Sequence, residues 1–591
     1  MSGIAGIFDE YHQITNQITI FEKMIQSMKH RGFYNSIYLD NHISLMQTCS
    51  SKSKEIVHVQ HYYIIFDGKC FNIEEIKEHL IQKDITNFDN DLEVILNLYS
   101  IYKEKCLDYM NGHFSFAIYD INEKSLFLVR DYLGVKPLFY TFIDKILVFA
   151  SEIKTLLTYP LVQPIIDTNS IQQLSYLGPG RIEGKTFFKN IFELKPGEYA
   201  LYKDNKFIKE KYYELKSKMH MDNYDETILN VRNIVTESIE AQVKDLDEFG
   251  AFLSGGLDSS IIVATLANYL KKQNKRLKTY SLEFKDNATN FIPSSYQPTL
   301  DSTYIQLMID KYDLDHKVIT LNNDDLINSL YESVDARDLP GMGDIDASLY
   351  CFCEKVKEEM DVVFSGECSD EIFGGYPWFK EKIDTFPWYR NIELRNSLLN
   401  EKYQTDYKTY IQDLFNKVLN NTHVNEYDFE HDIKYKQVVQ LNLHYFMQTL
   451  IDRNDRMASA FGLDVRVPFC DINVFNYVYS IPKSFKSVNS KEKGILREAF
   501  KDLLPIEIIE RTKSPFPKTY DPKYLETLRN ELYNLNHDCP LWKLFNREMV
   551  LNYFKIENYQ PWYGQLMTTP QTIAYFLQIN YWLKKYKIQI Q

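Results

Sequence analysis

The chain has 591 residues, of which 45% are hydrophobic and 25% are charged, a balance typical of globular proteins. One hydrophobic core rarely organises so many residues, so at least two domains are expected. The formal net charge of −14 argues against a general nucleic-acid-binding protein, which usually carries a basic patch. No apolar run is long enough for a membrane span, and the N-terminus does not read as a signal peptide.

Eight cysteines are spread along the chain without the paired spacing of a structural zinc site. Cys351 and Cys353 flank a single phenylalanine in an apolar run, and we expect both to be buried thiols. Because unpaired thiols are typical of a reducing compartment, the sequence favours a cytoplasmic location.

The first 215 residues predict an α+β domain of layered sheets and helices. Its segments rich in β-branched and aromatic residues predict strands. Other segments have the apolar spacing of helices. The predicted strands are Gly3–Phe8, Tyr62–Phe66, His113–Tyr119, Ser125–Val129 and Lys145–Ala150, and the predicted helices are Ile18–Met28, Ile73–Ile81 and Leu92–Tyr102.

From residue 225 the pattern changes to strands that alternate with helices, which predicts a parallel sheet covered on both faces. After Tyr376 the chain is predicted to be mostly helical up to residue 591. The predicted strands are Phe249–Leu253, Leu277–Phe284, His316–Thr320 and Val362–Phe364, and the predicted helices include Asp225–Val243, Ser259–Leu270, Thr303–Lys311 and further helices up to Val356.

A glycine-rich loop joins the first strand of this half to its following helix, the place where ligands bind in open parallel sheets. Gly255 and Gly256 allow the backbone to approach an anion closely. The helix N-terminus adds free N–H groups, and the carboxylate of Asp258 suits a Mg²⁺ ion beside phosphates. The hydroxyls that could donate to phosphate oxygens belong to Ser254, Ser259 and Ser260. A glycine turn with a serine helix cap is the simpler alternative.

A second small-residue loop follows the strand Val362–Phe364 and begins with Ser365 and Gly366. Three acids, Glu367, Asp370 and Glu371, lie within five residues and would repel one another unless a metal ion or a basic group lay among them. A solvated charged turn is the alternative, but the apolar strand before the loop and two glycines after it argue against that interpretation.

Basic residues occur in three later segments. Residues 452–469 interleave charged and apolar residues, and a salt-bridged helix explains them as well as a functional role does. Lys493 could neutralise an α-phosphate or an oxyanion, although such a lysine more often lies on an exposed helix face. Residues 512–519 form a rigid basic loop that could close on the site.

The order and spacing of these segments resemble the synthetase domain of the asparagine synthetase family, and the resemblance covers nearly the whole chain. It implies an N-terminal nucleophile-hydrolase-like (αββα) glutaminase domain over residues 1–215 and an α/β ATP-pyrophosphatase domain over residues 225–591. It implies that ATP and Mg²⁺ are bound, with Asp258 and Asp370 holding the metal ion and Glu367 and Lys493 acting in catalysis. The ATP-binding residues by this resemblance are Leu253, Ser254, Gly255, Gly256, Asp258, Ser259, Ser260, Ser365 and Gly366.

The N-terminal domain departs from the family at its glutaminase site. The family's nucleophilic cysteine is Ser2 here, and a hydroxyl is a far weaker nucleophile than a thiolate. This residue alone would also be consistent with an engineered trap. The family's Asn-Gly oxyanion hole is Asp67-Gly68, and its substrate-binding glutamate is Lys69. An ionised Asp67 cannot donate a hydrogen bond, and loss of one such donor costs about 10²–10³ in rate.

The rest of the family's glutamine clamp is also incomplete. No arginine lies between Arg31 and Arg130 to bind the glutamine carboxylate, so only Asp91 is left as a ligand of the glutamine amine. These joint changes predict that the domain folds and braces the synthetase half but no longer hydrolyses glutamine.

We therefore expect a ligase that adenylates a small-molecule carboxylate, aspartate first, and transfers it to ammonia or another amine with release of AMP and pyrophosphate. A homodimer is compatible with this interpretation. Two alternatives stay open. One is an amide synthetase or cyclase of a natural-product or cell-wall pathway, similar to β-lactam synthetases or lasso-peptide cyclases. The other is a nucleotide-binding pseudo-enzyme, which would require an impaired ATP site.

Overall fold

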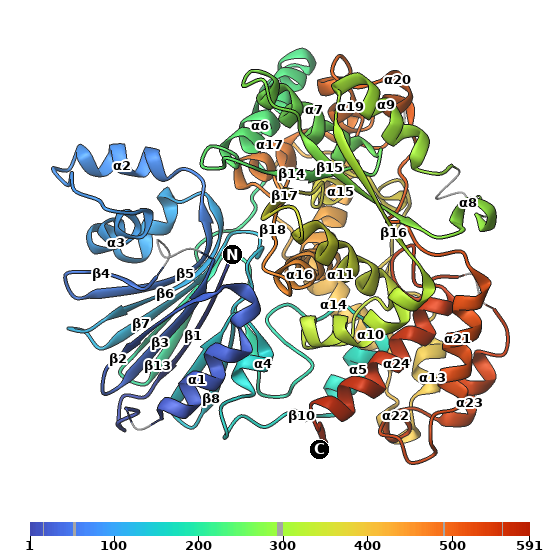
Figure 1. Ribbon diagram of the computed structural model, residues 1–591, viewed down its shortest axis with the longest axis horizontal. Coiled ribbons are helices and arrows are strands. Elements are labelled where there is room, and N and C mark those ends of the chain that lie inside the picture. Colours follow the sequence, from blue (N-terminus) through green and yellow to red (C-terminus); the bar gives the residue numbers. More distant parts are fainter. Residues whose placement is uncertain (16, 51–54, 292, 294–298, 489–490, 558–559) are drawn as a thin grey trace.

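The computed structural model describes residues 1–15, 17–50, 55–291, 293, 299–488, 491–557 and 560–591. Figure 1 shows two halves: the layered sheets of the N-terminal part on the left, and a smaller sheet with many helices on the right. The N-terminus lies at the boundary between them.

The N-terminal half contains two antiparallel sheets of six strands each among the described residues. The first sheet has the order β11-β8-β9-β1-β3-β2 and the second the order β13-β12-β7-β6-β5-β4. The strands are β1 (Ser2–Phe8), β2 (Tyr34–Leu39), β3 (Ile43–Cys49), β4 (Val57–Val59), β5 (Tyr62–Cys70), β6 (Gly112–Asp120), β7 (Ser125–Arg130), β8 (Phe139–Ile143), β9 (Ile146–Ala150), β11 (Phe192–Glu193), β12 (Glu198–Lys203) and β13 (Lys206–Lys211).

The two sheets pack face to face, because alternate residues of each strand are apolar and point inward. Buried side chains such as Ile4, Leu45, Ile65 and Leu128 fill the space between them. The helices α2 (Ile73–Ile81) and α3 (Asp91–Tyr102) cover the outer face of the second sheet. The first sheet is covered by α1 (Ile18–Ser27) and α4 (Ile153–Leu156), so the four layers form the expected αββα arrangement.

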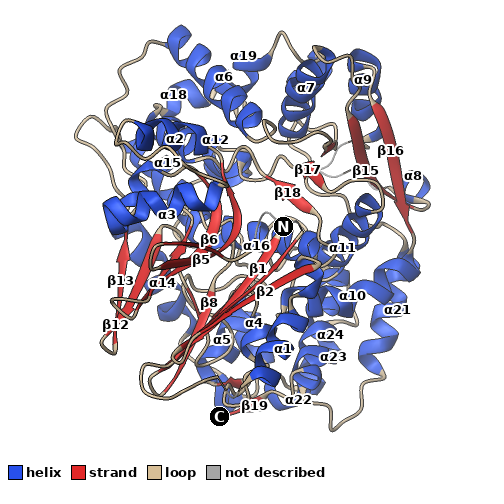
Figure 2. Ribbon diagram, turned by 60° about the vertical axis from the view of Figure 1, so that its left-hand side comes forward, coloured by secondary structure: helices blue, strands red, loops and turns tan. Residues whose placement is uncertain are grey.

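The second half is organised by a parallel sheet with the order β16-β15-β14-β17-β18. Figure 2 shows helices on both sides of it. Its strands are β14 (Gly250–Phe252), β15 (Lys278–Phe284), β16 (Asp315–Leu321), β17 (Val362–Phe364) and β18 (Asp464–Arg466), and the helices between them are α7 (Leu257–Lys271), α9 (Ser302–Tyr312), α10 (Asn323–Arg337) and α11 (Asp344–Lys357). The predicted α/β fold is confirmed, but the edge strand β18 interrupts a region that the sequence predicted to be helical.

The helical C-terminal part surrounds the carboxyl end of this sheet. The helix α16 (Met447–Ser459) lies between the two halves, and the segment before it, Asn442–Phe446, is a π-helix. The other long helices are α6 (Tyr224–Ala241), α14 (Tyr407–Asn420), α15 (Glu430–Leu441), α21 (Pro522–Tyr533) and α24 (Thr569–Lys585).

The end of the chain returns to the N-terminal half. The short strands β10 (Ile165–Ile166) and β19 (Gln589–Ile590) pair in parallel, and the N–H of Gln591 donates to the carbonyl of Ile166. One continuous hydrophobic cluster includes Ala5, Leu253, Val439 and Trp582, so apolar packing also runs through both halves.

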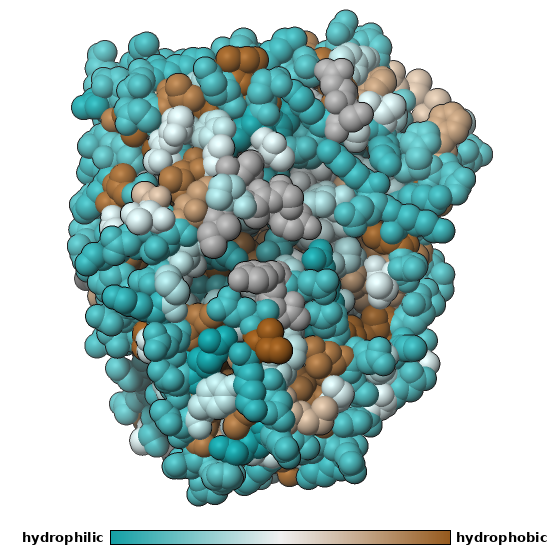
Figure 3. All heavy atoms as spheres, turned by 90° about the vertical axis from the view of Figure 1, so that its right-hand side faces the viewer, coloured by the Kyte–Doolittle hydropathy of each residue, from teal (hydrophilic) through white to brown (hydrophobic). Residues whose placement is uncertain are grey.

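The surface is mostly hydrophilic and the cysteines are unpaired, as the amino-acid composition predicts. The face shown in Figure 3 is mostly hydrophilic, with apolar residues scattered over it. Among the described residues, no helix has both the length and the apolar character that a membrane crossing needs. All eight cysteines are free and buried, which confirms the prediction for Cys351 and Cys353.

Candidate active site

Two loops meet where the neighbouring parallel strands β14 and β17 end. The carboxyl ends of parallel strands share one edge of the sheet, so the loops that follow them lie side by side. A Cβ atom added to Gly366 of the second loop would lie 3.0 Å from the Cβ of Asp258 in the first loop. The hydroxyl of Ser369 donates to Oδ1 of Asp258 at 2.7 Å. The loops are therefore in direct contact.

These loops form one wall of a cavity with a volume of about 230 Å³. Most of the residues that the sequence selected line it. They are Leu253, Ser254, Gly256, Asp258, Ser259, Ser365, Gly366, Glu367, Asp370 and Lys493.

Gly255 and Ser260 do not line this cavity. Gly255 has a positive φ of 65°, and a Cβ there would lie 2.6 Å from the Cβ of Tyr304, so its role is to shape the turn. Ser260 is fully buried in the first turn of α7, where helical periodicity turns its hydroxyl toward the protein interior. This buried position argues against the prediction that Ser260 donates to phosphate, whereas Ser259 and Ser254 hydrogen-bond to each other at the cavity wall.

Two lysines lie among the carboxylates of the paired loops. Nζ of Lys493 lies 2.6 Å from Oδ2 of Asp258 and also forms an ion pair with Asp370. Nζ of Lys513 lies 2.8 Å from the other oxygen of Asp370. Burial alone would raise the pKa of Asp370, but Lys493 and Lys513 lower it to about 2. The carboxylate is therefore ionised at neutral pH.

The same two carboxylates fit a magnesium ion that is shared with phosphates. The single ammonium group of Lys493 contacts both Asp258 and Asp370, so these two carboxylates lie close enough together to share a cation. Mg²⁺ is usually held by one or two carboxylates together with substrate phosphates, and this donor set matches that pattern. Across the described residues, no group of three or more His, Cys, Asp or Glu side chains could hold a metal ion unaided.

Glu367 of the second loop is held by an arginine of α16. Nη2 of Arg453 donates to Oε1 of Glu367 at 3.0 Å, and Arg453 is buried whereas Glu367 is partly exposed. The guanidinium group also lies over the ring of Phe516 in the basic loop, 5.2 Å from its centre. The position of Glu367 therefore depends on α16 and on that loop.

Sequence reasoning did not assign roles to Lys513, Arg453 and Arg511, all of which line the cavity. Arg511 donates to the carbonyl of Ser254 at 3.2 Å and pairs with Asp301. The only signal was the position of Arg453 and Lys513 in segments that were noted for their basic residues. Their partners lie up to 257 positions away in the sequence, so spacing could not reveal the pairs.

The predicted nucleophile position of the N-terminal half is enclosed. Ser2 is fully buried, its hydroxyl has no hydrogen-bond partner among the described residues, and its backbone N–H donates to Oδ1 of Asp67 at 3.1 Å. Nη1 of Arg31 donates to the other oxygen of Asp67 at 3.1 Å. Gly68 has a φ of 118°, and a Cβ there would lie 2.0 Å from the carbonyl oxygen of His113, so only glycine fits.

Asp91, the predicted ligand of the glutamine amine, is paired with a lysine of the same chain. Nζ of Lys69 lies 2.9 Å from Oδ2 of Asp91 and 2.5 Å from Oδ2 of Asp245. Burial would lower the pKa of Lys69, but hydrogen bonds to these two carboxylates raise it. Asp91 therefore already has an ammonium partner.

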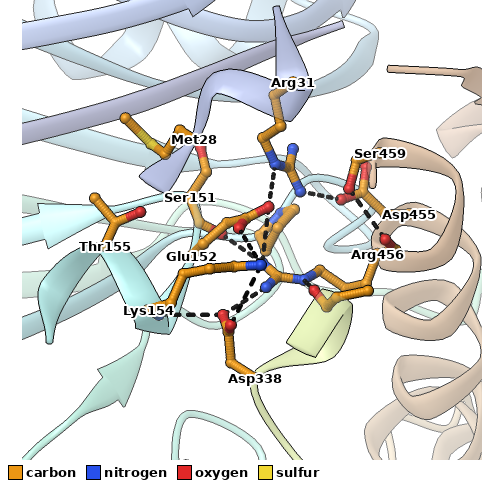
Figure 4. Close-up of polar contacts among 12 residues, drawn as sticks. Met28, Arg31, Ser151, Glu152, Lys154, Thr155, Asp338, Asp455, Arg456 and Ser459 are labelled. Carbon is orange, nitrogen blue, oxygen red and sulfur yellow. Dashed lines mark hydrogen bonds and ion pairs between the residues drawn. The ribbon is translucent and has the colours of Figure 1, made fainter. Parts of the chain in front are cut away.

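Buried ion pairs join α16 to the N-terminal half (Figure 4). Asp455 accepts hydrogen bonds from Arg31 at 2.7 Å and from Lys136 at 2.9 Å. Arg456 pairs with Asp338 and Glu152, and Glu152 also accepts from Arg31 at 2.6 Å. Charges on this face of α16 thus bind residues from both halves.

A second ion-pair group lies one turn earlier on α16. Oδ2 of Asp452 lies 3.0 Å from Arg181 of the N-terminal half and 2.9 Å from Arg337 of α10. Burial would raise the pKa of Asp452, but the two arginines hold it well below its usual range. The neighbouring residues Arg453 and Asn454 line the cavity, so the N-terminal half fixes the helix that shapes the active site.

The interface also contains a histidine whose titration predicts an acid-sensitive contact. Nε2 of His113 lies 2.7 Å from the carbonyl oxygen of Cys470, and burial lowers the pKa of His113 to about 4. This pKa is below the unfolded value of about 6.5. The contribution of neutral His113 to the free energy of unfolding is therefore complete above pH ~6.5 and is lost as the pH falls toward ~4. We expect the loss of unfolding free energy between pH 7 and pH 4.5 to be smaller in His113→Gln by about 2 kcal/mol.

Denaturant unfolding of both proteins at pH 7 and pH 4.5 measures the effect. The exposed His58 provides the control, because His58→Gln should leave the acid dependence unchanged. An equal loss of stability in His113→Gln and the unmodified chain would contradict this prediction.

Comparison with known proteins matches both halves. The Asparagine synthase family profile matches residues 230–584, and the glutamine amidotransferase domain profile matches residues 1–213. The chain is 35% identical to asparagine synthetase [glutamine-hydrolyzing] 3 of Bacillus subtilis, with all of both chains covered. It is 27% identical to asparagine synthetase [glutamine-hydrolyzing] 1 of the same organism, over 88% of this chain and 87% of that one.

A further relative is amidase chyE of Penicillium rubens, which is 23% identical over 78% of each chain. The family match covers more than half of the residues and includes both loops of the cavity. The chain belongs to the asparagine synthase family and is an ATP-dependent amide ligase.

Proposed function

We propose that this ligase joins aspartate to free ammonia through an acyl-adenylate and does not hydrolyse glutamine. A carboxylate oxygen of aspartate attacks the α-phosphorus of ATP, and pyrophosphate leaves with the bonding electron pair. Ammonia then attacks the acyl carbon, AMP leaves with its oxygen, and the nitrogen loses a proton. The products are asparagine, AMP and pyrophosphate.

The cavity supplies the groups that this chemistry needs. The loop from Ser254 to Ser259 offers backbone N–H groups and hydroxyls for phosphates at the start of a helix. Lys493 and Lys513 bring two positive charges to the same place, where negative charge develops during adenylation. Asp258 and Asp370 are the residues that would hold Mg²⁺, which when bound supplies further neutralisation of phosphate oxygens.

Glu367 is the acidic group best placed to act on the attacking amine. It lines the cavity, is partly exposed to it, and is oriented by Arg453. A carboxylate in that position can accept a proton from ammonia as the amide bond forms.

The loss of glutamine hydrolysis is supported by one observation above all: Lys69 binds Asp91 and Asp245 at the place where the family binds the glutamine amine. A substrate ammonium group would have to displace an ammonium group that is already tethered there. Asp67 adds a second obstacle, because this buried acid replaces a hydrogen-bond donor of the oxyanion hole.

We further propose that the N-terminal half serves as a brace for α16. Asp452 and Asp455 tie this helix to Arg181, Arg31 and Lys136, while Arg453 on the same helix orients Glu367. The helix would then keep its place without any glutaminase reaction.

The test is pyrophosphate release by the full chain with ATP and aspartate, supplied with either ammonium or glutamine. We expect saturable turnover with ammonium and only background release with glutamine. Ser2→Ala should behave like the unmodified chain in both assays, because the Ser2 hydroxyl has no hydrogen-bond partner in the described part of the chain. Equal or better turnover with glutamine would refute the loss of glutaminase function, and no turnover of aspartate with ammonium would refute the assigned substrates.

A further inference from the structure

The basic loop runs along the cavity and is fixed at both ends. At its start, Arg511 donates to the carbonyl of Ser254 at 3.2 Å, and its guanidinium carbon lies 3.9 Å from the centre of the Tyr304 ring. At its end, the carbonyl of Lys518 accepts from Nδ2 of Asn287 at 2.9 Å. Every residue between Arg511 and Lys518 lines the cavity, so these contacts fix the path of the loop along the site.

Two side chains of the loop reach different parts of the site. Nζ of Lys513 lies 2.8 Å from Oδ2 of Asp370, one of the two carboxylates assigned to Mg²⁺. The centre of the Phe516 ring lies 5.2 Å from the guanidinium carbon of Arg453 on α16. One loop therefore contacts both the phosphate end of the cavity and the arginine that orients the candidate base.

The backbone on both sides of Phe516 is restricted by the sequence. The ring belongs to the residue between Pro515 and Pro517. Proline fixes its own φ, and a residue that precedes proline is confined to extended conformations. The covalent chain therefore limits where the Phe516 ring can point, and this limit does not depend on a hydrogen bond.

The guanidinium group of Arg453 has few other contacts that could fix it. Its Nη2 donates to Oε1 of Glu367 at 3.0 Å, and Glu367 is its only ion-pair partner in the described chain. Its Nη1 lies 4.0 Å from Sδ of Met342, and a thioether is a weak acceptor. Nε has no hydrogen-bond partner among the described residues. The face of an aromatic ring attracts a guanidinium group at this distance, so the Phe516 ring supplies a contact that the hydrogen bonds do not.

We propose that Phe516 is a positioning residue for the amide-forming half of the reaction, because it holds the guanidinium group of Arg453, which orients Glu367. This inference rests on the proposed function, in which ammonia forms the C–N bond, the C–O bond to AMP breaks and Glu367 takes the proton. Adenylation instead uses the positive charges of Lys493 and Lys513. The basic loop thus contributes to both halves of the reaction through different side chains.

Two assays of the full chain separate the halves of the reaction. Aspartate-dependent ATP–pyrophosphate exchange measures adenylation, and asparagine formation with ammonium measures the complete reaction. Phe516→Leu should lower the rate of asparagine formation about tenfold more than the rate of exchange, since the ring contact is lost while Lys513 stays in place. More pyrophosphate should also be released per asparagine formed, because adenylate that waits for the amine reacts with water.

Further variants test whether the ring acts through the arginine. Phe516→Tyr keeps the aromatic face and should restore most of the asparagine formation. Arg453→Met should show the same selective loss, and adding Phe516→Leu to it should cost little more, because the effects of residues in contact are not additive when one acts through the other. The matched control is Phe429→Leu, which should leave both rates unchanged because the Phe429 ring is 70% exposed.

The outcomes separate this inference from the proposed function. Equal losses of exchange and of asparagine formation in Phe516→Leu would overturn the inference, and so would fully additive losses in the double variant. Arg453→Met provides the same comparison of the two rates if Phe516→Leu does not fold. No exchange by the unmodified chain with aspartate would instead refute the proposed function, and this inference with it.

Discussion

Replacing Lys493 with methionine is expected to lower the rate of aspartate-dependent ATP–pyrophosphate exchange by about 10²–10³. Its ammonium group is the cation that contacts Asp258 and Asp370 together, at the point where the two loops of the cavity meet. Methionine fills a similar volume but leaves negative charge at the α-phosphate without this partner. The loss should appear in the rate of exchange, and the fold should persist because Lys513 still pairs with Asp370.

The control for this variant is Lys491→Met, two residues away. Lys491 is partly exposed and pairs with Glu510 at the surface, where an ion pair contributes about 0–1 kcal/mol. We expect its exchange rate to match that of the unmodified chain, with circular dichroism used to compare the folds. If Lys493→Met retains the full exchange rate, the assignment of Lys493 to adenylation is wrong.

Replacing Asp455 with alanine is expected to lower the free energy of unfolding by about 3–5 kcal/mol, because breaking a buried ion pair leaves charges without a partner. Arg31 and Lys136 both donate to this carboxylate, and all three side chains are buried. Since Asp455 also anchors the helix that carries Arg453, exchange activity should fall at temperatures well below unfolding. Denaturant unfolding and an exchange assay at several temperatures measure the two effects.

An exposed ion pair serves as the comparison. Asp502 forms two hydrogen bonds with Arg232 at the surface, and Asp502→Ala should cost no more than about 1 kcal/mol. Equal destabilisation by Asp455→Ala and Asp502→Ala would show that the interface pairs do not hold the two halves together.

The sequence predicted those parts of the fold whose signal is local. The strand Gly3–Phe8 was predicted from its β-branched and aromatic residues and the helix Ile73–Ile81 from its apolar spacing, and the structure contains them as β1 and α2. The edge strand β18 was not predicted, because three residues between helices carry too little pattern and its pairing with β17 depends on residues about 100 positions earlier.

In the candidate site, too, the sequence predicted the local features but not the contacts between distant residues. Local chemistry singled out Asp258, Asp370 and Lys493, which the fold brings into contact. It could not show that Lys69 binds Asp245 in addition to Asp91, since that partner comes from the other half of the chain. Nor could it distinguish Ser259 from Ser260, because the choice between cavity and interior depends on where α7 begins.

The parallel pairing of β10 with β19 affects how the enzyme can move. A strand at the extreme end of the chain lies against residues 165–166, while α16 is tied to the N-terminal half at a separate place. Two attachment points far apart in space prevent a simple hinge between the halves, since rotation about one would break the other. Substrate entry should therefore rely on rearrangement of local loops such as residues 512–519, and cutting the chain between residues 215 and 225 should leave two fragments that stay associated.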